Sequence, residues 1–173
     1  EASSPISKVS FSKTHDGILD WLEKITKNLK DKPILLVFDY HVDVGTGRAL
    51  DGSWIRELRR GNMNVSTIYV IRPLWDYLIG ISEEVYDAAQ LLNVNIVNGV
   101  ESLPIRNKQV IVSFEADYIN DFSRGGVISD DMVKQELTRD VDILKKKKIS
   151  FLAMHFTPTL KDSFDSNKVI IEV

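Results

Sequence analysis

Two carboxylates and an imidazole occupy alternating positions after the first strongly apolar run of this sequence. Asp39, His41 and Asp43 directly follow the run at 34–38. In an extended chain, side chains at i, i+2 and i+4 project to one face, so we expect these three to point the same way. Carboxylates and imidazoles are ligands for Mn²⁺, Fe²⁺ or Zn²⁺, so the spacing indicates a metal site. The simpler alternative is a polar turn with a hydrogen-bonded histidine.

A second pair of carboxylates follows another apolar run. Glu115 and Asp117 come after residues 110–114, again with i, i+2 spacing. Alone, such a pair is typical of an exposed loop. Buried carboxylates brought together repel one another unless a cation or a proton neutralises them. If the two acidic segments face each other in one sheet, they therefore predict a bound cation.

The other histidines stand where a helix begins or a strand ends. His15 opens the first helical pattern, where the positive end of the helix dipole disfavours a protonated imidazole but tolerates a neutral, metal-bound one. His155 ends a late apolar run, before Thr157 and Pro158. For His15 the competing interpretation is an exposed side chain in a helix-capping region.

These residues are embedded in helix and strand patterns that alternate along the chain. The sequence predicts helices over 14–29, 53–60, 82–92 and 129–144. It predicts strands over 34–38, 65–71, 94–97, 110–114 and 149–154, with a last one over 169–173. Strands separated by helices imply right-handed crossovers and a mainly parallel sheet covered on both sides. In such sheets, ligands bind beyond the carboxyl ends of the strands.

The expected fold class is α/β, with a single three-layer α/β/α domain over 13–173 after a flexible N-terminal segment at 1–12. The 22 basic and 25 acidic residues give a net charge of −3, which favours neither a nucleic-acid nor a membrane partner. The absence of cysteine excludes thiolate chemistry and disulfides, and it fits a cytoplasmic location. The basic run at 145–148 is expected to be a solvated helix end.

Several segments resemble motifs of the arginase/agmatinase (ureohydrolase) superfamily. Residues 39–43 resemble its DxHxD motif, and residues 113–117 resemble its SFDxD motif with Glu in place of the first Asp. Residues 14–17 are similar to its GGDHS turn, and residues 125–129 to its PGGLS segment. The resemblance runs from about residue 12 to residue 160, and it implies an arginase/deacetylase-like fold.

The resemblance also implies two divalent metal ions, with Mn²⁺ expected and Zn²⁺ or Fe²⁺ as alternatives. One ion would be held by His15, Asp39, Asp43 and Glu115, and the other by Asp39, His41, Glu115 and Asp117. A hydroxide bridging the two ions would be the nucleophile.

Two departures from the family pattern bear on the substrate. Asp51 stands where the family has a proton-shuttling histidine, and it would need a raised pKa to donate a proton near neutrality. His155 stands where the family has a guanidinium-binding glutamate, and an imidazole offers no bidentate anionic partner. Asp51 and His155 are thus the acid–base candidates, and arginine is not the expected substrate.

Three functional hypotheses follow. The first is a metal-dependent hydrolase acting on a non-peptide C–N bond of a small amidine or amide. The second is a non-catalytic relative that serves as a binding or assembly module, motivated by the departures at Asp51 and His155. The third is an anion cradle at 45–47, where glycines after a strand expose amide donors, although Asp39 and Asp43 would repel a phosphate without metal. A homo-oligomer is compatible with each hypothesis.

Overall fold

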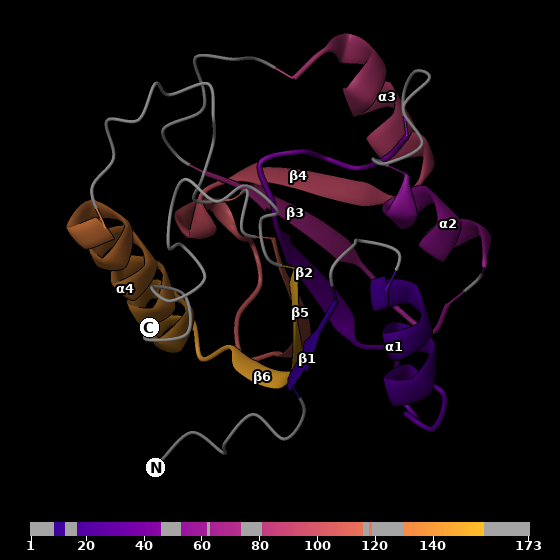
Figure 1. Ribbon diagram of the computed structural model, residues 1–173, viewed down its shortest axis with the longest axis horizontal. Helices are drawn as coiled ribbons and strands as arrows, with labels where there is room; N and C mark the ends of the chain where they lie inside the picture. Colours follow the sequence, from indigo (N-terminus) through magenta and orange to yellow (C-terminus); the bar gives the residue numbers. More distant parts are fainter. Residues whose placement is uncertain are drawn as a thin grey trace.

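The computed structural model describes residues 9–12, 17–45, 53–61, 63–73, 81–115, 118 and 130–157, in which helices and strands alternate (Figure 1). The strands are β1 (Val9–Phe11), β2 (Ile34–Phe38), β3 (Ile68–Arg72), β4 (Val94–Asn98), β5 (Gln109–Glu115) and β6 (Ser150–Thr157). The helices are α1 (Gly17–Thr26), α2 (Trp54–Arg60), α3 (Glu83–Leu91) and α4 (Asp130–Lys146), with the 3₁₀ turn η3 (Val100–Ser102). No helix among these residues is long and apolar enough to cross a bilayer.

The strands form one parallel sheet in the order β1-β6-β5-β2-β3-β4. β2 lies inside the sheet between β5 and β3, and Leu35, Leu36 and Val37 are fully buried. A strand that is covered on both faces needs apolar side chains at successive positions, which accounts for the continuous run Ile34–Phe38. The predicted parallel sheet is confirmed.

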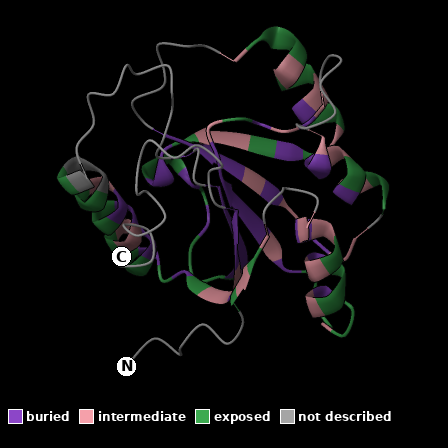
Figure 2. Ribbon diagram, viewed as in Figure 1, coloured by how far each residue is buried: buried purple, intermediate pink, exposed green. Residues whose placement is uncertain are grey.

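Helices cover both faces of the sheet (Figure 1). On one face, Ile18 of α1, Trp54 of α2 and Ala89 of α3 pack against alternate residues of β2 and β3. On the other face, Leu137 and Leu144 of α4 belong to a second cluster with strand residues that include Leu36, Phe38 and Val112. Buried residues accordingly concentrate on the strands between the helices (Figure 2). The predicted three-layer α/β/α arrangement is confirmed.

Several element boundaries differ from the sequence prediction; for example, β3 begins at Ile68 rather than at 65, and β6 ends at Thr157 rather than at 154. Residues 9–11, expected to belong to a flexible segment, instead form β1, an edge strand that pairs with β6. Three residues are too few to show a strand period, so sequence alone gives no signal for this strand. α1 ends at Thr26 rather than at 29. The predicted strand at 169–173 lies outside the described residues.

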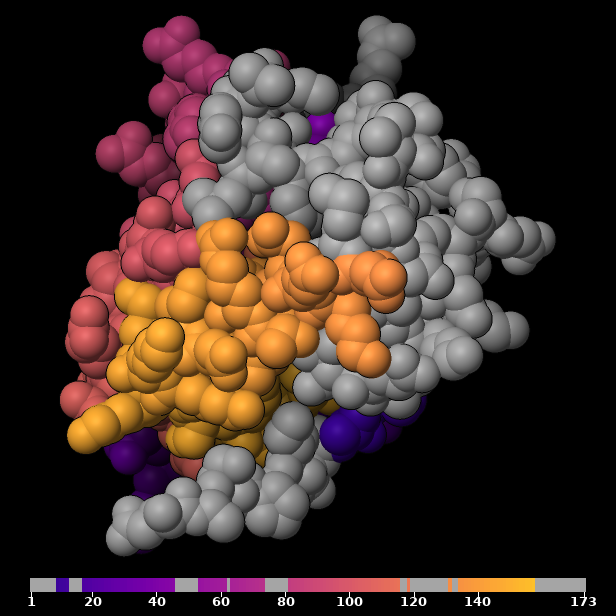
Figure 3. All heavy atoms as spheres, turned by 90° about the vertical axis from the view of Figure 1, so that its left-hand side faces the viewer, coloured from indigo at the N-terminus to yellow at the C-terminus, as the bar shows by residue number. Residues whose placement is uncertain are grey.

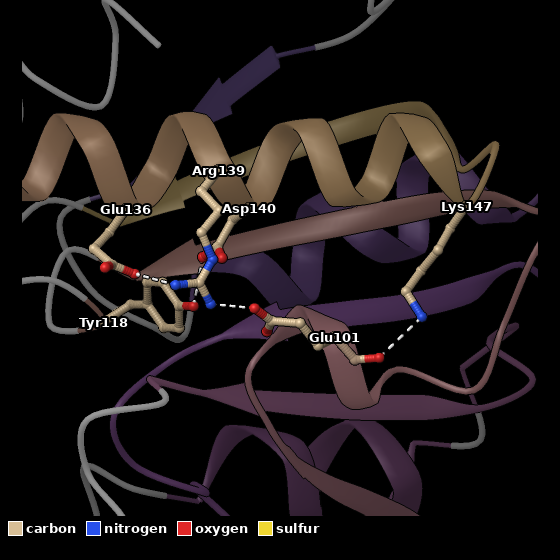
Figure 4. Close-up of polar contacts among 6 residues, drawn as sticks. All are labelled: Glu101, Tyr118, Glu136, Arg139, Asp140 and Lys147. Carbon is tan, nitrogen blue, oxygen red and sulfur yellow. Dashed lines mark hydrogen bonds and ion pairs between the residues drawn. The ribbon is translucent and has the colours of Figure 1, made fainter.

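α4 lies on the face of the molecule shown in Figure 3, and its polar side is exposed to solvent. Lys147, the residue after α4, donates hydrogen bonds from Nζ to the carbonyl oxygens of Glu101 in η3 (3.1 Å) and of Leu103 after it (2.7 Å). Figure 4 shows the contact of Lys147 with Glu101 beside the ion pair of Arg139 with Glu101. The expectation of a fully solvated basic run is therefore wrong at Lys147, because two backbone acceptors replace its water.

A buried hydrogen bond joins Tyr118 to α4. The Tyr118 hydroxyl donates to Oδ2 of Asp140 at 2.8 Å, and the two residues have exposed fractions of only 4% and 7% (Figure 4). Burial raises the pKa of Asp140 from 3.8 to about 6; the hydrogen bond from Tyr118 opposes this rise, and the charges of Glu101 and Glu136 add to it. The folded chain therefore holds a proton on Asp140 in a pH range where the unfolded chain has lost it.

This shift predicts that Asp140→Asn stabilises the protein at pH 8. Between about pH 4 and pH 6 the folded state binds more protons, so stability falls as pH rises through that window. A shift of about two pKa units corresponds to about 3 kcal/mol, and loss of the charge-assisted bond from Tyr118 offsets part of it. We expect a gain of about 1–2 kcal/mol in the free energy of unfolding at pH 8.

Urea unfolding between pH 4 and pH 8 measures this difference. Asp142→Asn removes an exposed carboxylate from the same helix and serves as the matched control. Equal pH slopes for Asp140→Asn and the unmodified chain would contradict the assignment.

Candidate functional site

Asp39 and Glu115 occupy equivalent positions on neighbouring strands. Phe38 pairs with Phe114 in the β2–β5 register, and each acidic residue is the next one along its chain. Adjacent strands lie about 4.8 Å apart, so the two residues are side by side at the carboxyl edge of the sheet. Both are buried, with exposed fractions of 0% and 1%. The two acidic strand ends anticipated from sequence are thus direct neighbours.

The carboxylate of Asp39 is only partly satisfied. Its Oδ1 accepts a hydrogen bond from the backbone N–H of His41 at 2.9 Å, whereas Oδ2 is buried without a hydrogen-bond partner among the described residues. Burial raises the pKa of Asp39 from 3.8 to about 7, and the charge of Asp43 adds to this, while hydrogen bonding to His41 opposes it. Near neutrality, this carboxyl group therefore needs either a proton or a cation.

The segment after β2 does not continue as an extended strand. β2 ends at Phe38, and the chain bends at Tyr40 and His41. The His41 side chain is 58% exposed, with its Nδ1 3.7 Å from Oδ1 of Asp39. The extended geometry on which the prediction for residues 39, 41 and 43 rested is therefore absent. A local bond from a backbone N–H to the Asp39 carboxylate replaces the strand geometry.

Asp43 is held by contacts from α2 and by its own loop. The indole Nε1 of Trp54 donates a hydrogen bond to Oδ2 of Asp43 at 3.0 Å. Val42 and Val44 on either side are buried, which anchors the loop to the core. Asp43 has a φ of 47°, a left-handed conformation that aspartate adopts more readily than most residues. The charge of Asp43 also raises the pKa of Asp39, which indicates that the two carboxylates lie near each other.

Gly45 serves packing against α2. It has a φ of 67°, and an added Cβ would come within 2.9 Å of Cβ of Ser53. Arg56 donates hydrogen bonds to the carbonyl oxygens of Val44 and Gly45. This close approach accounts for the glycine without an anion. The other two residues of the proposed anion cradle, 46 and 47, lie outside the described residues.

His155 lies inside β6 rather than at its end, on the face covered by α1. It is fully buried, and its Nε2 is hydrogen-bonded to Oγ of Ser12 at 2.7 Å. The Trp21 ring of α1 packs against the imidazole with centroids 5.2 Å apart. A Cβ on Gly17 would come within 2.5 Å of Cβ of Ser12, so only glycine lets α1 approach this closely. β1 and α1 together fix the imidazole.

Three further polar residues join this edge of the sheet, and sequence reasoning gave them no role. Ser12 follows β1, Ser113 pairs with His155 in the β5–β6 register, and Thr157 pairs with Glu115. Ser113 Oγ and Thr157 Oγ1 are buried without a hydrogen-bond partner among the described residues. The sequence signal for them is a polar residue at alternate positions of an apolar strand, on the face shared with Glu115.

The described residues contain four of the six predicted metal ligands: Asp39, His41, Asp43 and Glu115. Within them, no group of three or more His, Asp or Glu residues is arranged to hold a metal ion. Three of the predicted site residues, His15, Asp51 and Asp117, lie outside the part of the chain that the structure describes.

The donor chemistry nevertheless fits a hard divalent cation. Asp39, Asp43 and Glu115 offer carboxylate oxygens from two neighbouring strand ends. Asp39 Oδ2 is a buried acceptor without a hydrogen-bond donor among the described residues. A cation between these groups would relieve both their mutual repulsion and the cost of burying them.

Comparison with known proteins identifies the fold. No family model matches the sequence, and no curated protein matches it. Among solved structures, arginase from Medicago truncatula is similar with a TM-score of 0.61 at 13% identity, over 93% of this chain and 54% of that one. Proclavaminate amidino hydrolase from Streptomyces clavuligerus is similar with a TM-score of 0.56 at 14% identity, over 86% of this chain and 54% of that one.

A third solved structure, formimidoylglutamase from Bacillus subtilis, has a TM-score of 0.54 at 13% identity and covers 85% of this chain. This chain spans only 51% to 54% of the length of these three proteins. The chain therefore has an arginase-like fold, as its sequence motifs suggested. At such low identity the likeness concerns the fold alone.

Proposed function

We propose that this protein is a metal-dependent hydrolase that cleaves a C–N bond in a small amidine or amide substrate. The observation that carries the proposal is the burial of Asp39 and Glu115 on adjacent strand ends, with exposed fractions of 0% and 1%. Similarity of fold to an arginase and to an amidino hydrolase supports the reaction class. Mn²⁺ is the expected metal, with Zn²⁺ or Fe²⁺ as alternatives.

The chain's own residues divide into holding and positioning roles. Asp39, Asp43 and Glu115 would hold the metal, together with His15, His41 and Asp117. When bound, divalent cations supply Lewis acidity that activates water and stabilises developing negative charge. Trp54 orients Asp43 through its indole N–H, and the His41 N–H orients Asp39.

Proton transfer falls to His155 and Asp51. His155 is connected through Nε2 to Ser12, so the pair can pass a proton between imidazole and hydroxyl. Asp51 would act from the segment between β2 and α2, where it lies outside the described residues.

Metal counting combined with a turnover assay tests the proposal. Purified protein incubated with Mn²⁺ is analysed by mass spectrometry and assayed on a panel of small amidines and amides. We expect two ions per chain and release of an amine or ammonia, as in binuclear hydrolases. Asp87→Asn, which changes an exposed carboxylate on α3, should retain both ions. Bound metal without turnover on any member of the panel would refute the enzymatic assignment.

A non-catalytic binding or assembly module is the second candidate. The observation that favours it is that Asp51 and His155 replace the residues expected at their positions. Zero or one metal ion per chain, with no hydrolysis, would support this alternative over the enzyme.

A further inference from the structure

A row of polar side chains crosses the carboxyl edge of the sheet on the face that α1 covers. None of its strand residues is more than 5% exposed. The β5–β6 and β2–β5 registers place them next to one another. The row consists of Thr157 and His155 from β6, Glu115 and Ser113 from β5, and Asp39 after β2.

The row has two chemically different halves. Asp39 and Glu115 make the acidic half, which the proposed function assigns to the metal. Ser113, Thr157 and the Ser12–His155 pair make a hydroxyl and imidazole half. In this second half, Ser113 Oγ and Thr157 Oγ1 are buried and find no hydrogen-bond partner among the described residues. A buried hydroxyl without a hydrogen-bond partner is unfavourable, so these two groups are suited to a polar ligand.

The charge of the hydroxyl and imidazole half decides which ligand it suits. The His155 imidazole is neutral or, when protonated, positive, so it is never an anion, and hydroxyls carry no charge. An amidinium or guanidinium group would find no negative partner within this half, because the neighbouring carboxylates of Asp39 and Glu115 are assigned to the metal by the proposed function. A carboxamide offers one carbonyl acceptor and N–H donors, and hydroxyl groups can satisfy both kinds.

We propose that Ser113, Thr157 and His155 form a recognition subsite for an uncharged carboxamide, so that amides rather than amidines are the substrate class. The inference rests on the proposed function, because it assigns the substrate class of the same site. Ser12 is a positioning residue, since it fixes the imidazole through Nε2 at 2.7 Å. The subsite lies directly beside the metal-holding carboxylates, because Thr157 pairs with Glu115.

Benzamide and benzamidine test the subsite, because they share a skeleton and differ in charge at the group recognised. Binding of each is measured by ligand-observed NMR titration, with Mn²⁺ and again after chelation. We expect benzamide to bind at least about tenfold more tightly than benzamidine, because the charged amidinium of benzamidine would be desolvated without an anionic partner. Thr157→Val should lower benzamide affinity about five- to tenfold, the effect of one lost hydrogen bond. Thr138→Val, on the exposed side of α4, is the matched control.

His155→Glu provides the converse test, because a carboxylate at this position should let benzamidine bind. If that variant does not fold, Thr157→Val decides alone. Equal or tighter binding of benzamidine to the unmodified chain, or binding of neither ligand, would overturn the subsite. Selective benzamide binding by a protein that takes up no metal would leave the subsite standing and refute the proposed function. Metal uptake without selectivity for benzamide would refute the subsite and leave the proposed function standing.

Discussion

Replacing Asp39 with Asn is expected to lower Mn²⁺ affinity at least about 100-fold while stabilising the metal-free protein. Mutation of a residue that only orients a metal ligand already lowers affinity by up to about 100-fold. The affinity falls because the fully buried Asp39 carboxylate lies beside Glu115 and is the predicted bridge between the ions. The amide keeps the acceptor that the His41 N–H needs, so the local turn is preserved. One substitution thus acts in opposite directions on two measurable quantities.

The stabilising half of this expectation follows from the pKa of Asp39. Burial and the charge of Asp43 raise it from 3.8 to about 7. Without metal, the folded chain therefore binds more protons than the unfolded chain between about pH 4 and pH 7, and its stability falls as pH rises through that range. Above pH 7 the full cost is present, and Asn removes it. We expect a gain of about 1–3 kcal/mol at pH 8, less than the whole shift because the new N–H group also needs a partner.

Two measurements separate these effects. Titration calorimetry with Mn²⁺ gives the affinity, and urea unfolding in a chelator at pH 5 and pH 8 gives the stability. Asp87→Asn should change neither, because its carboxylate is exposed on α3. Full metal occupancy of Asp39→Asn would show that this residue does not bridge the ions. Loss of stability at both pH values would show that its burial carries no electrostatic cost.

The fold was largely predictable because its strands are buried on both faces. Continuous apolar runs such as 34–38 and 110–112 are typical of the inner strands of a covered parallel sheet, and helical patterns separate them here. Local chemistry also located the start of α3, where the Ser82 side chain accepts a hydrogen bond from the Val85 N–H. β1 escaped prediction because three residues carry no period, and its place in the sheet depends on pairing with the distant residues 154–156 of β6.

The candidate site was predictable only at strand ends. Asp39 and Glu115 follow buried strands, so the order of the sheet determines their neighbourhood. Residues 40–45 were not predictable, because the turn depends on a side-chain bond at Asp39 and on positive φ values at Asp43 and Gly45. The alternating pattern also does not predict the contacts from α2. Trp54 and Arg56 donate hydrogen bonds to loop residues 11 and 12 positions earlier in the sequence. Loop chemistry thus depends on tertiary contacts that a periodic pattern does not encode.

Substitution of Trp54 should have the second-largest effect on stability and metal affinity, since Trp54 joins the core to the loop that is proposed to hold the metal. It is 1% exposed, and its indole donates to Asp43. Trp54→Ala removes a large core side chain and should cost about 3–5 kcal/mol of unfolding free energy. Trp54→Phe keeps most of the apolar volume and removes the N–H. We expect it to weaken Mn²⁺ binding about tenfold, because a hydrogen bond to a charged group contributes about 1.5–3 kcal/mol.

Leu58→Ala distinguishes the loss of packing from the loss of positioning. Leu58 is fully buried on the same helix, and its side chain carries no polar group to orient Asp43. It should therefore lower stability by about 2–5 kcal/mol while the folded protein keeps its Mn²⁺ affinity. Equal affinity losses in Leu58→Ala and Trp54→Phe would mean that α2 acts only as packing. A loss confined to Trp54→Phe would mean that the indole N–H sets the geometry of Asp43, because the two changes share a helix and differ in the bond they remove.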